Sequence, residues 1–188
     1  MKTALLIVDI QNEYFPGGKR ELVNPLAAAQ KAYLLLQCFR EHKMPTVHIQ
    51  HIAERPNASS FLPGTPGTHI HDAVAHFEGE PLVQKHHPNA FRETNLLTLL
   101  KDWRIERVII TGMMTHMCVD ATARAAADFG FQVMIAEDAC ATRGLTHGDT
   151  TIPAEQVHKA FLAALTHYGK VMTAEQILAY LAAEQAGV

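Results

Sequence analysis

The stretch RVIITGMMTHMCVDATARAAADFG, residues 107–130, decides the fold. An apolar run ends at Gly112, a few polar or flexible residues follow, and Cys118 stands where an alanine-rich segment begins. This order predicts a strand, a tight turn and the N-terminus of a helix. A thiol at such a position is exposed to the helix dipole and to unpaired backbone N–H groups, which favour the thiolate. Cys118 is therefore a candidate nucleophile, although a lone cysteine in an α/β protein is more often a small buried apolar residue.

The same alternation of strand and helix runs through the whole chain. Continuous apolar runs at residues 3–10 and 46–52 fit strands that are buried on both faces of a parallel sheet. Residues 53–67 are rich in proline, glycine and serine and predict a long loop of the kind that covers sites. Further strands are expected at 81–85, 107–111, 132–139 and 170–173, and helices at 25–43, 69–77, 95–103, 118–129, 153–168 and 174–185. The pattern predicts one α/β domain over residues 1–188.

Composition narrows the classes of partner. The chain has 188 residues, of which 48% are hydrophobic and 19% charged, and its net charge is -3. Such a chain can bury a sizeable core, and it lacks the basic stripe that binds nucleic acid. The N-terminal apolar run reaches Asp9 after a few residues, so neither a signal peptide nor a membrane span is expected, and the expected location is cytoplasmic. The three cysteines form no C-x-x-C pair and are expected to be reduced.

Three residues with reactive side chains follow strands of the expected sheet. Asp9 closes the first strand, Lys85 closes another, and Cys118 follows the turn after a third. The carboxyl ends of parallel strands meet at one edge of the sheet, which is where such proteins bind ligands. The positions therefore predict that the carboxylate, the ammonium and the thiol lie together.

These groups predict a covalent hydrolytic reaction. The carboxylate of Asp9 takes the thiol proton, Cys118 attacks a carbonyl carbon, and Asp9 returns the proton to the leaving amine, which leaves a thioester. Water then releases the acid. Lys85 keeps Asp9 ionised and balances the thiolate. No cofactor is needed for this chemistry.

The segments that carry these residues resemble the isochorismatase-like cysteine hydrolases, which include nicotinamidases, N-carbamoylsarcosine amidohydrolases, ureidoacrylate amidohydrolases and streptothricin hydrolases. Nearly the full chain takes part in the resemblance. The matches are a D-x-Q-x-x-F motif at Asp9, Gln11, Tyr14 and Phe15, a lysine before an x-A-F turn at Lys85, Ala90 and Phe91, and G-x-x-T-x-x-C at Gly112, Thr115 and Cys118.

The resemblance implies a three-layer α/β/α sandwich with a six-stranded parallel sheet. It also implies an Asp9, Lys85 and Cys118 triad, a small amide or ureide substrate, and a homodimer or homotetramer. The substrate-binding residues are expected to be Gln11, Phe15, Phe91, Thr115 and His116. For His87 and His116, a role in packing or in a subunit contact is as good an interpretation as contact with the substrate.

The resemblance further implies an oxyanion hole in the turn before the cysteine. The N–H groups of Met114 and Cys118 are the expected donors, with a cis peptide bond between Met113 and Met114. One such donor contributes about 3–4 kcal/mol to stabilising a transition state in a measured case. Gly112 is expected to permit the close turn, and the Thr115 hydroxyl to hold the loop by a local hydrogen bond.

Departures from the family narrow the type of reaction that is expected. Nicotinamidases bind a metal through an aspartate and a histidine after the second strand, but His51 and Ala53 stand there, so no metal is expected. Isochorismatases proper lack the cysteine, so Cys118 with Lys85 favours amide or ureide cleavage over ether cleavage. The alternatives are a metal-assisted nicotinamidase, and an inactive ligand-binding or thiol-sensing member of the fold.

Overall fold

A single parallel sheet forms the centre of the molecule. The structure is a computed structural model that describes residues 1–187. Six strands pair in the order β3-β2-β1-β4-β5-β8, and every pair is parallel. The strands are β1 (Thr3–Val8), β2 (Thr46–His51), β3 (Leu82–Lys85), β4 (Arg107–Met113), β5 (Gln132–Ala141) and β8 (Lys170–Met172). The expected six-stranded parallel sheet is confirmed.

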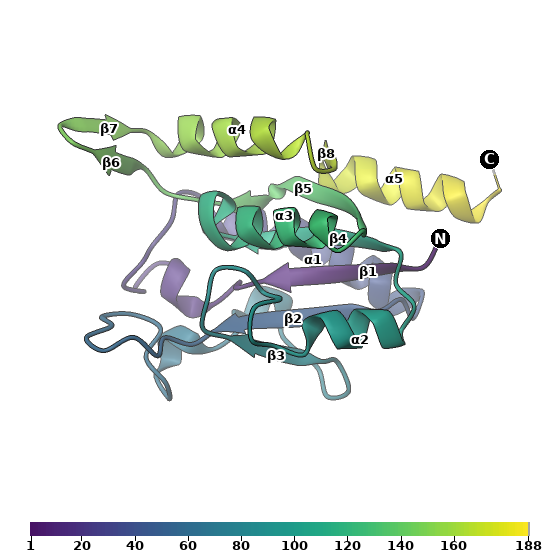
Figure 1. Cartoon of the computed structure of the whole chain (residues 1–188), viewed down its shortest axis with the longest axis horizontal. Coiled ribbons are helices and arrows are strands. Elements are labelled where there is room, and N and C mark those ends of the chain that lie inside the picture. Colours follow the sequence, from purple (N-terminus) through teal and green to yellow (C-terminus); the bar gives the residue numbers. More distant parts are fainter. Residues whose placement is uncertain (188) are drawn as a thin grey trace.

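Helices cover both faces of the sheet, as Figure 1 shows. The helices are α1 (Pro25–Glu41), α2 (Leu96–Asp102), α3 (Asp120–Asp128), α4 (Ala154–Leu165) and α5 (Ala174–Gln185). Leu5 and Ile7 of β1 pack in one core with α1 and α5, whereas Leu6 and Val8 pack in a second core with α2, α3 and α4. Successive side chains of a strand point to opposite faces, so the continuous apolar run of β1 serves both cores. This is the three-layer sandwich expected from the sequence.

The order of the strands creates a crevice at the centre of the sheet. From β1 the chain adds β2 and β3 on one side, and then crosses to place β4, β5 and β8 on the other side. Ligands of such sheets bind outside the carboxyl ends of the strands where the order reverses, which here is between β1 and β4.

Backbone conformation at this crevice depends on particular residues. Gly112 has φ +128°, and a Cβ on it would lie 1.9 Å from the carbonyl oxygen of Val8. Glycine is therefore required where β4 approaches β1. Asp9, the first residue after β1, has φ 51°, in the left-handed region that aspartate tolerates better than most residues. The carboxylate thus lies one residue beyond the strand rather than at its last position.

Two local elements differ from the predicted ones. The helix expected at residues 69–77 is only the single 3₁₀ turn η3 (Asp72–Val74), in which Val74 alone is buried. Residues for which no strand was predicted form an antiparallel hairpin of β6 (Leu145–His147) and β7 (Thr150–Ile152), which projects from the body in Figure 1. Its residues are mostly exposed, so no apolar alternation marked it in the sequence.

The helix after β4 begins earlier than the sequence indicates. Residues Thr115–Val119 form one π-helical turn, η4, which continues into α3. Cys118 lies inside this wide turn and not at the first position of the helix. The remaining short turns are η1 (Asn12–Tyr14) and η2 (Pro66–Thr68). Within residues 1–187, the structure has no helix that is both long and apolar enough to cross a membrane.

Candidate active site

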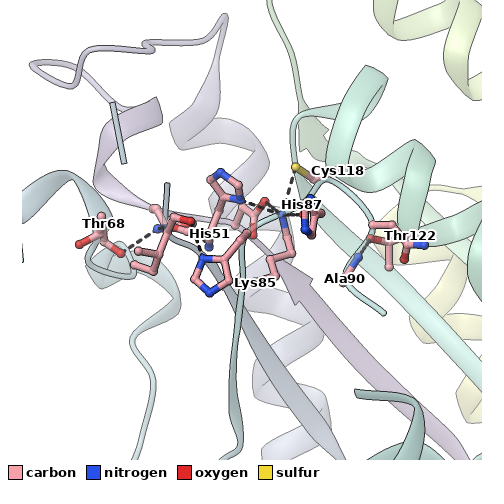
Figure 2. A network of polar contacts seen from close by, with 12 residues as sticks. His51, Thr68, Lys85, His87, Ala90, Cys118 and Thr122 are labelled. Atoms are coloured by element: carbon pink, nitrogen blue, oxygen red, sulfur yellow. Dashed lines mark hydrogen bonds and ion pairs between the residues drawn. The ribbon is translucent and has the colours of Figure 1, made fainter. Parts of the chain in front are cut away.

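Asp9, Lys85 and Cys118 meet at the carboxyl edge of the sheet, beside the β1–β4 crevice. Nζ of Lys85 lies 2.7 Å from Oδ2 of Asp9 and 3.2 Å from Sγ of Cys118. Asp9 and Lys85 are fully buried, and Cys118 is 4% exposed. Figure 2 shows the lysine reaching from β3 toward the sulfur at the start of the α3 segment. The structure thus brings together the three reactive groups that the sequence placed after three different strands.

Further contacts hold the Lys85 ammonium in place. Nζ lies 3.1 Å from the carbonyl oxygen of His87 and 3.4 Å from Nδ1 of His51. Burial opposes the charge on Lys85, but its interactions with the Asp9 carboxylate and with the Cys118 sulfur outweigh burial, so the pKa of Lys85 is raised. Burial lowers the pKa of His51 to about 4, so this imidazole is neutral at pH 7 and its Nδ1 accepts from the ammonium. The lysine is therefore a fixed positive charge.

Burial biases the thiol of Cys118 toward its protonated form. Burial and then the negative charge of Asp9 raise its pKa well above the usual range, and the Lys85 ammonium offsets only part of this. The ammonium of Lys85, which favours the thiolate, thus acts against the desolvation of the thiol. A base is needed to remove the proton.

Within residues 1–187, Asp9 has the unoccupied hydrogen-bond acceptor sites that such a base needs. Apart from the ammonium of Lys85 and the thiol of Cys118, no donor within residues 1–187 reaches its two buried carboxylate oxygens. Buried carboxylates are normally saturated with hydrogen bonds. The open lone pairs of Asp9 face the one group whose proton must move.

The turn between β4 and Cys118 exposes a backbone donor. The Met113–Met114 bond is cis, at the position that the family resemblance implies. Within residues 1–187 the Met114 N–H donates to no backbone carbonyl, and Met114 and Cys118 both line the cavity at the site. Oγ of Thr115 lies 2.9 Å from Nδ1 of His158 and 3.3 Å from the Ala141 carbonyl oxygen. The hydroxyl thus links the turn to α4 and β5, over a longer range than the expected local bond.

A cavity of about 330 Å³ opens above the sulfur of Cys118. One wall is the loop at residues 53–61, which confirms that part of the predicted long loop covers the site. The other walls include Tyr14, Arg20 and Arg143. This volume is at the lower end of the range for small-molecule sites.

A buried carboxylate outside the cavity organises the loop. Oε1 of Glu13 accepts from the N–H of Phe61 at 2.8 Å, and Oε2 accepts from the N–H of Lys19 at 3.3 Å. Gly67 passes so close that a Cβ there would lie 2.3 Å from Oε2. Glu13 therefore joins the loop after β1 to the loop after β2, and these loops supply two sides of the cavity.

Gln11 and Phe15, predicted to bind substrate, lie outside the cavity lining. The Gln11 amide donates to the carbonyl oxygens of His51 and Thr68, and its oxygen accepts from the His51 N–H at 2.8 Å. Phe15 is 3% exposed and stacks on His71, with ring centroids 3.6 Å apart. Both residues hold the loops around the site in place, because their polar groups and ring faces are already occupied.

Phe91, Thr115 and His116 are not part of the cavity lining either. Phe91 packs in the core beside α3, against Phe129 at 5.2 Å between ring centroids. Thr115 is fully buried, and Nδ1 of His116 bonds the Thr142 hydroxyl. These residues brace the turns on either side of Cys118 and lie outside the lining of this cavity.

Several residues of the cavity were not found from the sequence. Tyr14 was recognised only as part of a motif, and Arg20 and Arg143 carried no recognisable pattern. Arg20 lies in the loop before α1, and Arg143 lies between β5 and the β6–β7 hairpin.

His87 and the residues at the place of the nicotinamidase metal ligands contact other protein groups. Nε2 of His87 lies 3.0 Å from Oε2 of Glu93, and its carbonyl holds Lys85. At the place of the nicotinamidase metal ligands, His51 contacts Lys85 and Ala53 lines the cavity. In residues 1–187, no three His, Cys, Asp or Glu side chains are placed to hold a metal ion.

Comparison with known protein families shows to which family the chain belongs. The isochorismatase domain matches residues 3–176 of the chain. The chain belongs to the isochorismatase family. Its sequence is 47% identical over 179 residues to the isochorismatase family protein YddQ of Bacillus subtilis, and the match covers 95% of this chain and 99% of that protein.

A solved structure agrees with the assignment. An isochorismatase hydrolase from Oleispira antarctica superposes with a TM-score of 0.91 and 46% identity, over 95% of this chain and 96% of that one. Nicotinamidase 3 of Arabidopsis thaliana is 33% identical, over 74% of this chain and 73% of that protein. The family supports a hydrolase.

Proposed function

We propose that the protein is a cysteine hydrolase that cleaves the C–N bond of a small amide, carbamoyl compound or ureide. The observation that carries the proposal is the placement of Lys85 Nζ between a buried carboxylate and a buried thiol, at 2.7 and 3.2 Å. Relatives whose names describe hydrolysis of this kind add support, and they are nicotinamidase 3, streptothricin hydrolase and maleamate amidohydrolase.

The first half of the reaction forms an acyl-enzyme. The Sγ–H proton of Cys118 moves to Asp9 as sulfur bonds to the carbonyl carbon. Asp9 then gives that proton to the nitrogen, the C–N bond breaks, and an amine leaves. Because burial raises the pKa of the Cys118 thiol, Asp9 is needed as a base to generate the attacking sulfur nucleophile.

The second half consumes water. Asp9 takes a proton from a water molecule, whose oxygen attacks the thioester carbonyl, and the carbon–sulfur bond breaks. The proton on Asp9 returns to the Cys118 sulfur, and the acid leaves. The sum is amide plus water giving acid plus amine, without a redox change or a cofactor. Lys85 stays charged throughout and stabilises whichever partner carries the negative charge.

Negative charge on the substrate oxygen requires donors above the sulfur. We assign the N–H groups of Met114 and Cys118 to this oxyanion hole, since both residues line the cavity and the Met114 N–H has no backbone acceptor within residues 1–187. Donors fixed before the reaction stabilise a transition state because they need no reorganisation.

The proposal is tested with a panel of small primary amides, carbamoyl compounds and ureides. Ammonia or amine release is measured for the wild type and for Cys118→Ala, and the acyl-enzyme is trapped by rapid quenching and read as a mass increase on the Cys118 peptide. Turnover that disappears with Cys118→Ala supports the proposal. Turnover that survives it, or no turnover on the whole panel, contradicts it and favours the binding or thiol-sensing alternative.

A further inference from the structure

The turn that carries the catalytic cysteine is held by side chains that lie outside the substrate cavity. Oγ of Thr115, at the start of η4, lies 2.9 Å from Nδ1 of His158 in α4 and 3.3 Å from the carbonyl oxygen of Ala141 in β5. His158 is not part of the lining of the Cys118 cavity, and it borders a second cavity of about 230 Å³ between α1, β5 and α4. Any effect of His158 on the reaction is therefore transmitted through the turn.

Thr115 lies between the two groups that act on the substrate carbonyl. It directly follows Met114, whose N–H is assigned to the oxyanion hole, and it shares the π-helical turn with Cys118. Its side chain is fully buried, and within residues 1–187 His158 is the only side chain that bonds its hydroxyl. A β-branched side chain has few χ1 rotamers, so a bond to the hydroxyl also restrains the backbone of the turn.

The bond between Thr115 and His158 does not depend on the protonation of the imidazole. A hydroxyl both donates and accepts, so it pairs with Nδ1 whether or not this nitrogen carries a proton. When the hydroxyl accepts from Nδ1–H, its own proton remains available for the Ala141 carbonyl oxygen. The link between the turn and α4 is therefore a fixed support and not a pH-dependent switch.

The turn needs such support because its backbone conformation is uncommon. The N–H of Val119 bonds the carbonyl oxygen of Met114, five residues back, where an α-helix would bond four residues back. Single π-helical turns of this kind are rare and are found mostly at functional sites. A change to the α-helical form would rotate the Cys118 side chain relative to Lys85. A bond to Thr115, inside the turn, helps to keep the wide form.

We infer that His158 is a positioning residue for hydrolysis, which holds Thr115 and thereby aligns the Met114 N–H and the Cys118 sulfur with the substrate carbonyl. The inference rests on the proposed hydrolase function. It gives α4, which contributes no residue to the lining of the Cys118 cavity, a defined part in the reaction. Loss of this alignment lowers the rate more than the affinity, because the aligned groups act on the transition state.

The first experiment measures kcat and KM on the substrate found in the amide panel. His158→Leu removes the imidazole and keeps an apolar side chain, and it is expected to lower kcat by about 10- to 100-fold with KM within about threefold of the wild type. His158→Asn returns a polar amide close to the position of Nδ1 and is expected to recover most of kcat. His167→Leu, which replaces an exposed histidine just beyond α4, is the matched control and keeps wild-type kinetics.

A double-mutant cycle shows whether His158 acts through Thr115. Thr115→Val removes the hydroxyl at nearly constant volume and is expected to lower kcat as much as His158→Leu does. The double variant is expected to be no slower than either single variant, because both substitutions break the same bond. Effects on kcat that multiply in the double variant overturn the inference, since each residue then acts separately.

Two measurements separate positioning from a general loss of structure. Urea denaturation is expected to show that His158→Leu is folded under the assay conditions, and its profile of kcat against pH keeps the wild-type shape, because the imidazole exchanges no proton with the substrate. A folded His158→Leu protein with wild-type kcat overturns the inference, as does a loss of kcat that His158→Asn fails to recover. If His158→Leu is unfolded, Thr115→Val decides, and wild-type kcat in that variant overturns the inference.

The reactivity of the thiol tests the inference separately from the hydrolase function. Iodoacetamide alkylates Cys118 without any substrate, at a rate that depends on the placement of the sulfur beside Asp9 and Lys85. His158→Leu and Thr115→Val are each expected to slow this alkylation by about threefold or more, and His167→Leu to leave it unchanged. Wild-type alkylation rates in both variants overturn the inference. Slowed alkylation in the variants, when the wild type cleaves no compound of the panel, contradicts the proposed function alone.

Discussion

Two acid–base clusters lie at opposite ends of β3, and they differ in how fully their carboxylates are bonded. The catalytic cluster comprises Asp9, Lys85 and Cys118 at the carboxyl ends of the strands. The structural cluster comprises Arg40, His48 and Glu80, with Glu80 just before β3 begins. Both contain a cation within 2.7 Å of a carboxylate oxygen.

Both carboxylate oxygens of Glu80 accept hydrogen bonds, and Oε2 has three partners. Arg40 donates to both oxygens at 2.6 and 2.8 Å, Nε2 of His48 lies 2.9 Å away, and the Phe77 N–H donates at 3.1 Å. Burial alone raises the pKa of this carboxyl, but the Arg40 and Phe77 hydrogen bonds lower it to about 2. Asp9 has Lys85 and a thiol only. A saturated carboxylate stabilises the fold, whereas an unsaturated one keeps the capacity to move a proton.

The largest expected effect is on the catalytic cluster. Cys118→Ala and Asp9→Asn each reduce hydrolysis by about 10⁴-fold or more, because thiol and base act in one proton-coupled attack. Turnover is measured on the substrate found in the amide panel, and circular dichroism verifies that the Cys118→Ala protein is folded. Wild-type turnover by Cys118→Ala is incompatible with the mechanism.

Replacement of the shared cation gives the next largest effect. Lys85→Met raises the pKa of the Cys118 thiol further, because the ammonium is the group that lowers it, and slows alkylation by iodoacetamide at pH 7 by about tenfold or more. Lys31→Met, which removes a partly exposed lysine beside Glu175, is the matched control and leaves alkylation unchanged. If both variants react at the wild-type rate, Lys85 has no role in thiol activation.

The structural cluster is expected to respond in stability and not in activity. Glu80→Gln leaves the Arg40 guanidinium without its carboxylate and costs about 1–3 kcal/mol in the free energy of unfolding. Urea denaturation measures this cost, with kcat/KM kept within about threefold of the wild type. Glu155→Gln breaks an exposed pair with Lys159 and is expected to have no measurable effect on stability. If the Glu80→Gln protein keeps its full stability but loses catalytic activity, the structural role assigned to the Glu80 cluster is wrong.

The structural cluster contains one neutral histidine, His48, and another, His51, contacts Lys85 of the catalytic cluster. These two histidines predict a pH dependence of stability. Burial lowers the pKa of His48 and of His51 from 6.5 to about 4. Between these values the unfolded chain binds protons that the folded chain does not, so stability falls as pH falls from about 6.5 to 4. The contribution of each histidine is at most about 3 kcal/mol. His48→Gln therefore flattens the slope of unfolding free energy against pH in this window by about half.

The low pKa of Glu80 adds a second, more acidic phase. Its stabilisation is complete above the ordinary pKa of 4.5 and is lost as pH falls toward 2. Glu80→Gln removes this phase and leaves the His51 part of the first phase in place. An unfolding profile with the wild-type slope in both variants refutes the linkage.

The smallest expected effect is that of a chelator. His51 faces Lys85 and Ala53 has no ligand atom in its side chain, so exhaustive treatment with EDTA is expected to leave hydrolysis unchanged. Activity that disappears and returns with zinc or iron contradicts this expectation and supports the metal-assisted alternative.

Much of the catalytic cluster was predictable, because its residues follow strands. An apolar run such as TALLIV forms a strand whatever its neighbours are, and parallel strands bring their carboxyl ends to one edge. Asp9, Lys85 and Cys118 were therefore placed together from sequence position alone. The structural cluster was not, since Arg40, His48 and Glu80 occupy an α-helix, a strand and a loop with no shared pattern.

The sequence by itself determined the six strands of the sheet, the five helices of the sandwich and the edge at which chemistry occurs, because periodicity and chain connectivity are local properties. Only the tertiary structure decided which side chains line the cavity. Gln11 and Thr115 lie in motifs that resemble those of the family, yet their polar groups are used in hydrogen bonds that hold the loops, whereas Arg20 and Arg143 line the cavity from unrelated loops. The charge state of Cys118 was decided there too, because burial, which no local pattern records, raises its pKa more than Lys85 lowers it.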